Sequence, residues 1–422
     1  MARIEPLRAV RYDLAAAGGL ERVIAPPYDV IDEPMRAELE GRSPYNVVRI
    51  DLPRAQNGGD PYEHASELYD GWQSEGVLVR DQAPELWALM QNYTGPDGRP
   101  YTRRGFFCRV RVEEYGAGRI RPHERTHPGP REDRLRLTRA TRANLSPIFS
   151  LYPDPDQTAW SALEPLTAGE PFATVTDDEA TLNRLWRIDD PGAVRAVQGA
   201  LAPRELLIAD GHHRYETARV YADEVGGEGE HRWVLMYCCA LEDPGLAVFP
   251  THRLLTDLKD SARQEALGAT LREHFEVEEL ADERELEPPP DTDGIVLGYM
   301  DAHFLRPFCL TLRDPSSAAR VLADRSDAYR RLDTAVLEAL VLRGPLAMTD
   351  HDIDEKRGLD YSKDFDDALA ALRDGRADAA FFMRPTPVEQ VRAVAAAGES
   401  MPPKSTYFYP KVPTGLVFNP LE

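Results

Sequence analysis

The chain has 422 residues, which is enough for two or three domains at roughly 100–200 residues per domain. Its 50 Lys and Arg residues are outnumbered by 72 Asp and Glu residues, so the formal net charge is −22. This charge argues against a generic nucleic-acid binder or a protein that binds anionic membranes, because both need a basic surface.

The pattern of residues 1–115 predicts an N-terminal α+β region. Apolar residues recur at helical spacing between positions 62 and 75, and the Gly- and Pro-containing turn at 94–98 separates two strand-like runs. The expected elements are a strand end and rigid turn over 23–31, a helix over 34–40, a half-buried strand over 46–52, a helix over 62–75, and paired strands over 85–93 and 104–113.

Residues 116–245 form the second predicted domain. A buried strand over 206–209 leads through a turn at 210–213 into a helix over 214–225. The other expected elements are a helix over 131–144, strands over 146–152 and 182–188, a helix over 192–201, and a buried strand over 233–241.

Residues 246–422 form the third predicted domain, a C-terminal α+β region that ends in a tail dense in proline and aromatic residues. The acidic, Pro-rich segment 278–293 is the best candidate for a linker or a long loop. The expected elements are helices over 262–274, 328–342 and 365–373, and strands over 294–300, 308–312 and 379–383.

Cysteine usage and the N-terminus indicate the compartment. The four cysteines form no CxxC pair, so neither a disulfide framework nor a zinc ribbon is predicted. The first residues lack the apolar core of a signal peptide, and the longest apolar run, 233–241, is far shorter than the roughly 20 residues of a membrane span. We therefore expect a cytoplasmic protein with no nucleic-acid or membrane partner.

The first candidate site is the turn Asp210-Gly211-His212-His213-Arg214 between a buried strand and a helix. Backbone N–H groups at a helix N-terminus attract anions, and Gly211 lets a ligand approach the backbone. The histidines and Arg214 add donors suited to a phosphate, and Asp210 could hold a metal ion or orient a hydroxyl. The alternative is that Asp210 caps the helix and the histidines only pack or face water.

The second candidate is His123-Glu124-Arg125-Thr126-His127, which matches the HExxH pattern of zinc peptidases. That pattern works only on a helix, and prolines at positions 122 and 128 flank it here. We therefore predict a non-helical loop that presents Glu124 and one or both histidines, with no stoichiometric zinc.

Two clusters of cations complete the candidates. The helix over 131–144 carries Arg139 and Arg142, which could neutralise phosphates, although a solvated face with i,i+4 ion pairs is equally compatible. The tail segment 402–411 carries Lys404 beside hydroxyls and aromatic rings, as a lid over a nucleotide or simply as a packed tail. The segments 26–29 and 250–253 are weaker candidates of the same kind.

Four segments of the chain closely resemble the bacterial and archaeal domain-of-unknown-function 1015 family. They are IAPPYDVI, THPGPREDRLRLTRATRANLSPIFSLY, LLIADGHHRYETA and KSTYFYPK. This resemblance covers nearly the whole chain, and the family name carries no activity.

A more distant resemblance links the boxes IRPHE and IADGHHR to the ParB-like/sulfiredoxin superfamily, and within it to the free-serine kinase branch. It implies a mixed α/β fold with a ParB-like nucleotide-binding core that carries an insertion near 152–201, between large N- and C-terminal elaborations. Carried over by motif, Glu124 and Asp210 would be catalytic, with Glu124 as the base. The residues that would bind phosphate or substrate are His123, Arg139, Arg142, Gly211, His212, His213, Arg214 and Lys404.

The leading hypothesis from the sequence is a phosphotransferase that uses ATP or ADP with Mg²⁺ to phosphorylate a small hydroxylated metabolite, with free L-serine as the first choice. One rival is a ParB-like regulator that binds a nucleotide without turnover. The other rival is a metal-dependent hydrolase that uses His123, His127, Asp210 and His213. Product formation separates the first two hypotheses, and metal content of the purified protein tests the third.

Overall fold

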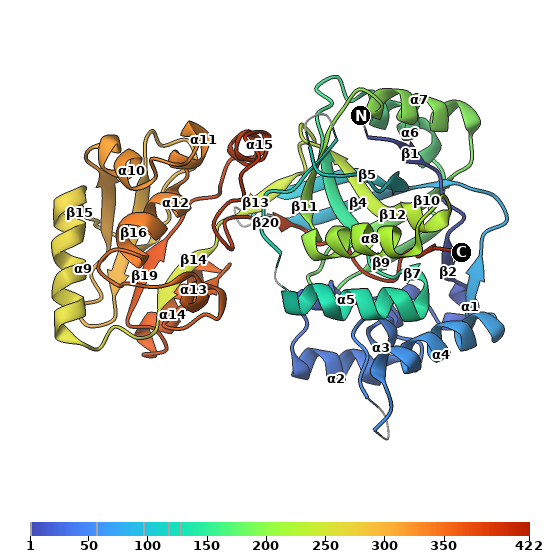
Figure 1. Ribbon diagram of the computed structural model, residues 1–422, viewed down its shortest axis with the longest axis horizontal. Helices are drawn as coiled ribbons and strands as arrows, with labels where there is room; N and C mark the ends of the chain where they lie inside the picture. The colour runs from blue at the N-terminus through green and yellow to red at the C-terminus, as the bar shows by residue number, and fades with distance from the viewer. Residues whose placement is uncertain (1, 56–57, 96–97, 117–118, 127) are drawn as a thin grey trace. The chain divides into compact units, whose positions relative to one another are not determined.

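The computed structural model describes residues 2–55, 58–95, 98–116, 119–126 and 128–422 (Figure 1). The chain forms two compact units. The first contains residues 1–122, 126–247 and 410–422, and the second contains residues 123–125 and 248–409. Each unit combines a β-sheet with helices, which confirms the predicted mixed α/β class.

The first unit contains most of the secondary structure. Its helices are α1 (Leu14–Ala17), η1 (Leu20–Arg22), η2 (Tyr28–Val30), α2 (Glu33–Arg42), α3 (Val48–Asp51), α4 (Pro61–Ser74), α5 (Pro128–Thr141), α6 (Thr158–Leu163), η3 (Glu164–Thr167), α7 (Pro191–Leu201), α8 (His212–Val225) and η4 (Glu230–Arg232). Its strands are β1 (Ile4–Glu5), β2 (Val10–Tyr12), β3 (Leu78–Arg80), β4 (Leu86–Thr94), β5 (Pro100–Arg111), β6 (Ile120–Arg121), β7 (Ala143–Asn144), β8 (Ile148–Tyr152), β9 (Ala173–Thr176), β10 (Leu182–Ile188), β11 (Leu206–Asp210), β12 (Trp233–Ala240) and β21 (Asn419–Pro420).

A nine-stranded sheet organises this unit within the described ranges, in the order β6-β11-β8-β12-β5-β4-β10-β9 with β1 paired to the end of β5. The pairs β6–β11 and β8–β12 are parallel, and the other pairs along this order are antiparallel. Strands from both 1–115 and 116–245 therefore lie in one sheet, and residues 410–422 return to the same unit. The three-part division drawn from the sequence stays a prediction.

The core of the first unit lies on the central strands. All eight residues of β12 are buried, as its unbroken apolar sequence predicted, and alternate residues of β5 and β8 join its core with side chains from α6, α7 and α8. Helix α8 also packs against α5, and α5 packs against α4 (Figure 1). The start of α8 is thus fixed by the sheet and by a second helix.

The second unit has its own six-stranded sheet in the described residues, in the order β15-β17-β16-β19-β14-β18. The strands of this sheet are β14 (His252–Leu255), β15 (Phe275–Glu279), β16 (Val296–Asp301), β17 (Phe308–Leu312), β18 (Leu359–Ser362) and β19 (Ala379–Phe382). Two further strands, β13 (Ala247–Phe249) and β20 (Tyr407–Tyr409), pair with each other. The helices of the second unit are α9 (Ser261–His274), η5 (Glu283–Glu285), α10 (Pro315–Val321), α11 (Asp327–Arg330), α12 (Asp333–Leu337), the π-helical η6 (Glu338–Leu342), α13 (Asp350–Asp354), α14 (Phe365–Arg373) and α15 (Val388–Ala396).

Some predicted elements were wrong. The strand expected over 46–52 is the short helix α3, because the Asn46 side chain accepts a hydrogen bond from the Val48 N–H (3.0 Å) and donates to the carbonyls of Arg22 and Ile24. The strand end expected over 23–31 contains the 3-10 turn η2. The single helix expected over 328–342 is broken before Asp333, where the buried Leu332 is extended.

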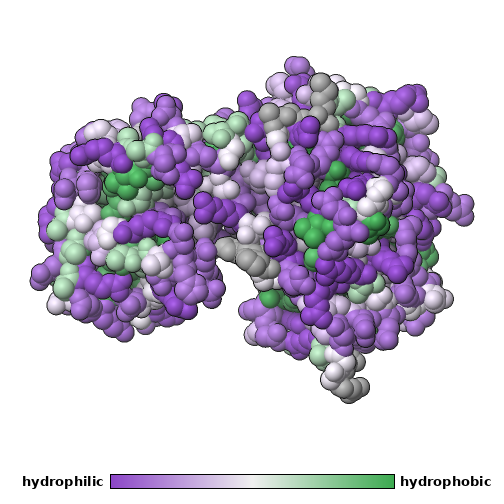
Figure 2. Space-filling view, viewed as in Figure 1, coloured by the Kyte–Doolittle hydropathy of each residue, from purple (hydrophilic) through white to green (hydrophobic). Residues whose placement is uncertain are grey.

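The face of the molecule in Figure 2 is mostly hydrophilic. On the face in Figure 2, hydrophilic residues predominate and apolar residues occur in small separate groups. In the part of the chain that the structure describes, no helix has both the length and the apolar character needed to cross a bilayer.

The ionisation of Glu287 should make the stability of the second unit depend on pH. Burial raises the pKa of Glu287 to about 7, and its carboxylate lies 3.7 Å from the buried His252 ring. Burial also lowers the pKa of His252 to about 4, so this histidine is neutral between pH 5 and pH 8. In that range the folded state binds more protons at Glu287 than the unfolded state does, so the contribution of Glu287 to the free energy of unfolding falls as pH rises. The contribution of His252 has the opposite sign, because the lowered pKa makes the unfolded state bind more protons at this residue.

We expect this fall in the contribution of Glu287 to be about 1 kcal/mol between pH 5 and pH 8, because the partly exposed side chain is screened by solvent. The Glu287→Gln variant should lose this component of the pH dependence. Urea unfolding of both proteins at several pH values measures it. If the unfolding free energies of the wild-type protein and of Glu287→Gln change with pH in parallel, Glu287 is not the source of this pH dependence.

Candidate functional site

The candidate site is built on the turn from β11 to α8 in the first unit. The first four residues of β11 are buried, and the pairing with β8 shifts register between Ile208 and Asp210. Gly211 follows in the left-handed conformation (φ 94°), and α8 begins at His212. Glycine has no side chain with which to cap the helix, so Gly211 gives the first turn of α8 no side-chain hydrogen bond.

Arg214 folds back over this turn. Its Nη2 donates to Asp210 Oδ2 (2.6 Å), and its Nη1 donates to the Pro147 carbonyl. The Arg214 side chain is only 9% exposed, and its Nε is buried and has no acceptor among the described residues. A buried guanidinium N–H without an acceptor therefore lies at the start of an uncapped helix.

Gly211 is required for this arrangement. A Cβ atom at position 211 would lie 2.9 Å from Arg214 Nε, and the positive φ is itself unfavourable for any other residue. We expect Gly211→Ala to lower the free energy of unfolding by about 2–3 kcal/mol, of which about 1–2 kcal/mol is the conformational cost. Gly76→Ala is the matched control, because Gly76 has a similar φ (+74°) and open space around it. Equal losses of unfolding free energy in the two variants would mean that the Arg214 side chain moves away from the new Cβ atom without a measurable energetic cost.

Asp210 is enclosed by two cations. Its Oδ1 accepts from Lys411 Nζ (2.7 Å), and its Oδ2 accepts from Arg214. Burial opposes the charge of Asp210, but Lys411 and Arg214 outweigh burial and hold the pKa of Asp210 well below its usual range. The turn therefore joins a permanently ionised carboxylate, two cations and a helix N-terminus.

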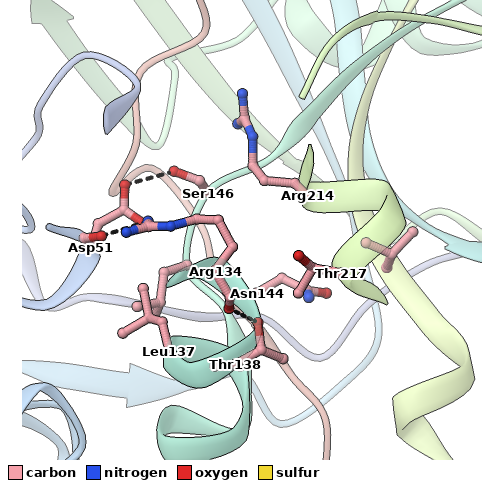
Figure 3. Close-up of a pocket in the computed structure, with 11 residues that line it drawn as sticks. Asp51, Arg134, Leu137, Thr138, Asn144, Ser146, Arg214 and Thr217 are labelled. Atoms are coloured by element: carbon pink, nitrogen blue, oxygen red, sulfur yellow. Dashed lines mark hydrogen bonds and ion pairs between the residues drawn. The ribbon is translucent and has the colours of Figure 1, made fainter. Parts of the chain in front are cut away.

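Next to the turn, a small cavity of about 30 Å³ lies between α5, α8 and the segment 143–146, which contains β7 (Figure 3). Arg134 points to Asp51, to whose carbonyl and Oδ1 it donates (2.6 and 3.2 Å), whereas Arg214 points away from this pair. Ser146 Oγ donates to Asp51 Oδ2 (3.0 Å). The cavity has room for water but not for a nucleotide.

Tyr28, from the weak candidate segment 26–29, lies beneath the Arg134 guanidinium (4.1 Å to the ring centre). Burial raises the pKa of Tyr28 to about 12, against the opposing charges of Arg214 and Arg134. Its hydroxyl is therefore protonated at neutral pH. This segment thus contributes an aromatic contact to Arg134, one of the residues that line the cavity.

Arg139 of α5 and Arg142, which follows the end of α5, lie on the surface. Arg139 is paired with Glu224 of α8 (2.6 Å), and Arg142 is paired with Glu422 (2.9 Å). Both are exposed, and Arg142 has a positive φ of 48°. Exposed pairs of this kind contribute little to stability, and the phosphate-binding roles predicted for Arg139 and Arg142 stay predictions. Arg134 of α5 is buried.

His212 and His213 begin α8 beside Arg214; His212 is buried and His213 is half-buried. Lys404 belongs to the second unit, where it is exposed and has a positive φ of 54°. The roles predicted for these three residues stay predictions.

The segment around Glu124 is a loop in the second unit. Residues 122–126 contain no helix, and His127 lies outside the described residues. The His123 carbonyl accepts from the Met401 N–H (2.7 Å), and the buried His123 ring contacts Thr406 Oγ1 through Nε2 (3.0 Å). His123 therefore fixes this loop to the tail of the second unit, and the half-buried Glu124 follows it.

Within the ranges that the structure describes, no three His, Cys, Asp or Glu side chains gather as a metal-binding group. Asp210 is the carboxylate of the turn, and both its oxygens already accept hydrogen bonds from cations. The turn thus fits Mg²⁺ only when the ion arrives on phosphate oxygens and needs one protein carboxylate.

Sequence reasoning missed Lys411, Asp51 and Arg134 as neighbours of the turn. Lys411 carried a signal, since two of the five lysines of the chain fall in the segment 402–411, but Lys404 was chosen instead. Arg134 lies in the arginine-rich helix predicted over 131–144, but Arg139 and Arg142 were the residues named from it. Asp51 carried no signal, because only the tertiary fold brings it to Arg134, 83 positions away.

Comparisons with known proteins give one family and several structures. The model of the family described as "Protein of unknown function (DUF1015)" matches residues 4–335. No curated protein matches the chain.

Three solved structures are among those that match the chain. A free serine kinase variant in complex with AMP is 13% identical, with 74% of this chain and 92% of that chain covered and a TM-score of 0.38. A conserved hypothetical protein from Pyrococcus furiosus is 16% identical (74% and 95% covered, TM-score 0.36). SbnI from Staphylococcus aureus, with a C-terminal truncation, is 11% identical (73% and 85% covered, TM-score 0.36).

Proposed function

Because the chain belongs to the family described as "Protein of unknown function (DUF1015)", whose name gives no activity, we propose its function from the site. We propose a phosphotransferase that uses ATP or ADP to phosphorylate a small hydroxylated metabolite. Free L-serine is the first acceptor to test, as the resemblance of the motifs implies.

The observation that carries this proposal is the uncapped start of α8 with the buried Arg214 Nε beside it. A helix N-terminus and a guanidinium are the groups that proteins use most readily to bind phosphate. The Arg214 Nε supplies a donor that no described residue satisfies, and a phosphate oxygen would satisfy it.

Each residue then has a role in the transfer. Gly211, the N–H groups of the first turn of α8, Arg214 and Lys411 bind and neutralise the phosphates. The acceptor oxygen attacks the terminal phosphorus, the bond to the bridging oxygen breaks, and Glu124 takes the hydroxyl proton. Mg²⁺, when bound to the nucleotide, would neutralise charge on the phosphate oxygens, and Asp210 is the residue that would hold it.

A regulator that only binds nucleotides would use the same turn, so turnover must be measured. Purified protein is incubated with ATP or ADP, Mg²⁺ and a panel of hydroxylated metabolites that begins with L-serine, and the phosphorylated product is detected by mass spectrometry. Arg214→Met should lose both nucleotide binding and product. Arg136→Met is the matched control, because it removes an exposed arginine from the neighbouring helix.

The outcomes separate the hypotheses. Product formation that requires Arg214 supports the phosphotransferase. Tight nucleotide binding without any product would favour the regulatory switch. Absence of nucleotide binding in the wild-type protein would contradict both, and Arg214→Met with wild-type activity would remove the turn from the mechanism.

A further inference from the structure

Arg103 of β5 is a buried cation without an anionic partner. Its side chain is fully buried, and no described carboxylate pairs with it. Its Nε and Nη2 both donate to Gln91 Oε1 on β4, the former at 3.0 Å, and its Nη1 has no acceptor among the described residues. Burying a guanidinium without a counter-ion lowers the stability of the folded state. A neutral amide as the partner of Arg103 therefore suggests a role other than stability.

The Arg103 guanidinium fixes the direction in which Gln91 points. A guanidinium can only donate, so the Gln91 atom that faces it is the oxygen and the amide N–H groups point the other way. Gln91 Nε2 donates to Asn183 Oδ1 (2.9 Å) on β10 and to the Lys411 carbonyl (3.2 Å). Asn183 donates in turn to Asp177 Oδ2 (3.0 Å).

This chain of hydrogen bonds ends at the phosphate site. The Lys411 carbonyl is held by Gln91, and the Lys411 ammonium reaches Asp210 (2.7 Å). Arg103 also stacks on Phe149 (4.4 Å to the ring centre), the residue that pairs with Asp210 between β8 and β11. The network and the turn therefore belong to one sheet, in which β8 and β12 lie between β5 and β11.

We propose that Arg103 and Gln91 are positioning residues that hold Lys411 against Asp210 in the phosphate site, an inference that rests on the proposed function. The lysine side chain has four rotatable bonds, so a fixed backbone carbonyl narrows the positions that its ammonium can reach. A glutamate at position 91 would pair better with Arg103, but it could not donate to the Lys411 carbonyl. The amide is the residue type that accepts from Arg103 and donates to Lys411 at once.

The test is Gln91→Glu, which supplies Arg103 with a counter-ion and removes the donor to Lys411. We expect the thermal stability to be unchanged or higher, because the buried cation becomes paired. We also expect Lys411 to react several-fold faster with an amine-modifying reagent, as measured by mass spectrometry of the full chain. Lys259, which is exposed and lies in the second unit, is the internal control and should not change.

A second variant guards against an effect of the new charge. The double substitution Gln91→Met with Arg103→Met removes the donor without burying a charge, and it should speed the labelling of Lys411 in the same way. Wild-type labelling of Lys411 in both variants would overturn the proposal. Faster labelling of all five lysines together with a lower melting temperature would also overturn it, because the role would then be structural.

Nucleotide binding tests the connection to the site. Gln91→Glu should weaken ADP binding by about tenfold, and it should have no further effect when Lys411 is already replaced by Met. An equal weakening in the Lys411→Met background would contradict an action through Lys411. If the wild-type protein binds no ADP while Lys411 labelling changes as expected, the proposed function fails and the positioning role stands.

Discussion

Asp210→Asn should lower turnover by roughly 10³-fold while phosphate groups still bind. The substitution keeps the size of the side chain and removes the charge that holds Arg214 and Lys411 in place. Two partly buried cations then lack their partner, so we also expect a loss of about 3–5 kcal/mol in the free energy of unfolding. The freed cations remain near the start of α8, so ADP affinity should stay the same or rise. Steady-state kinetics, calorimetric titration with ADP and urea unfolding measure the three effects.

Asp51→Asn is the matched control for this stability cost. Asp51 is also buried, and it also pairs with a buried arginine, Arg134, in the same unit. Burial raises the pKa of Asp51 against the opposing charges of Arg134 and Arg214. Its replacement should destabilise the protein and leave most of the turnover. If the two variants lose turnover equally, Asp210 has only a structural role.

The sequence predicted well those elements whose pattern is repeated over many residues. The continuous apolar run of β12, the paired strands β4 and β5, and the helices α4, α7 and α9 all lie within a few residues of the predicted positions. Such elements owe their structure to a periodic burial pattern that is visible in the sequence alone. The segment 46–52 also alternates, but the hydrogen bonds of Asn46 to distant carbonyls decide its conformation, and these carbonyls are not visible in the sequence.

The candidate site was predictable in part for the same reason. The strand, glycine and helix around Gly211 are consecutive in sequence, so a local pattern predicted the turn correctly. Lys411 lies 201 positions from Asp210, and Gln91 lies 320 positions from Lys411. Only the tertiary fold, which no local pattern encodes, brings Lys411 to Asp210 and to Gln91.

Glu124 is the residue that the proposed phosphotransferase would use as its general base. The loop that carries it is fixed by His123, whose backbone and ring both bond to the tail of the second unit. A glutamate is ordinarily ionised at neutral pH and can accept the proton of an acceptor hydroxyl. It is a weak base toward an alcohol, but a loose phosphoryl-transfer transition state needs only a late and small movement of that proton. The carboxylate then mainly orients the hydroxyl for attack on the phosphorus.

Glu124→Gln should therefore reduce kcat by roughly 10²–10⁴-fold, the usual contribution of a general base, while ADP affinity barely changes. Glutamine keeps the shape of the side chain and its ability to hydrogen-bond, but it cannot take the proton, so the loss falls on the chemical step and not on binding. Glu132→Gln, at an exposed glutamate of α5, should leave both quantities at wild-type values. Steady-state kinetics measure kcat, and calorimetric titration measures ADP affinity, for the wild-type protein and the two variants. If ADP binding falls as steeply as turnover, Glu124 binds the nucleotide or its metal ion, and the base is another residue.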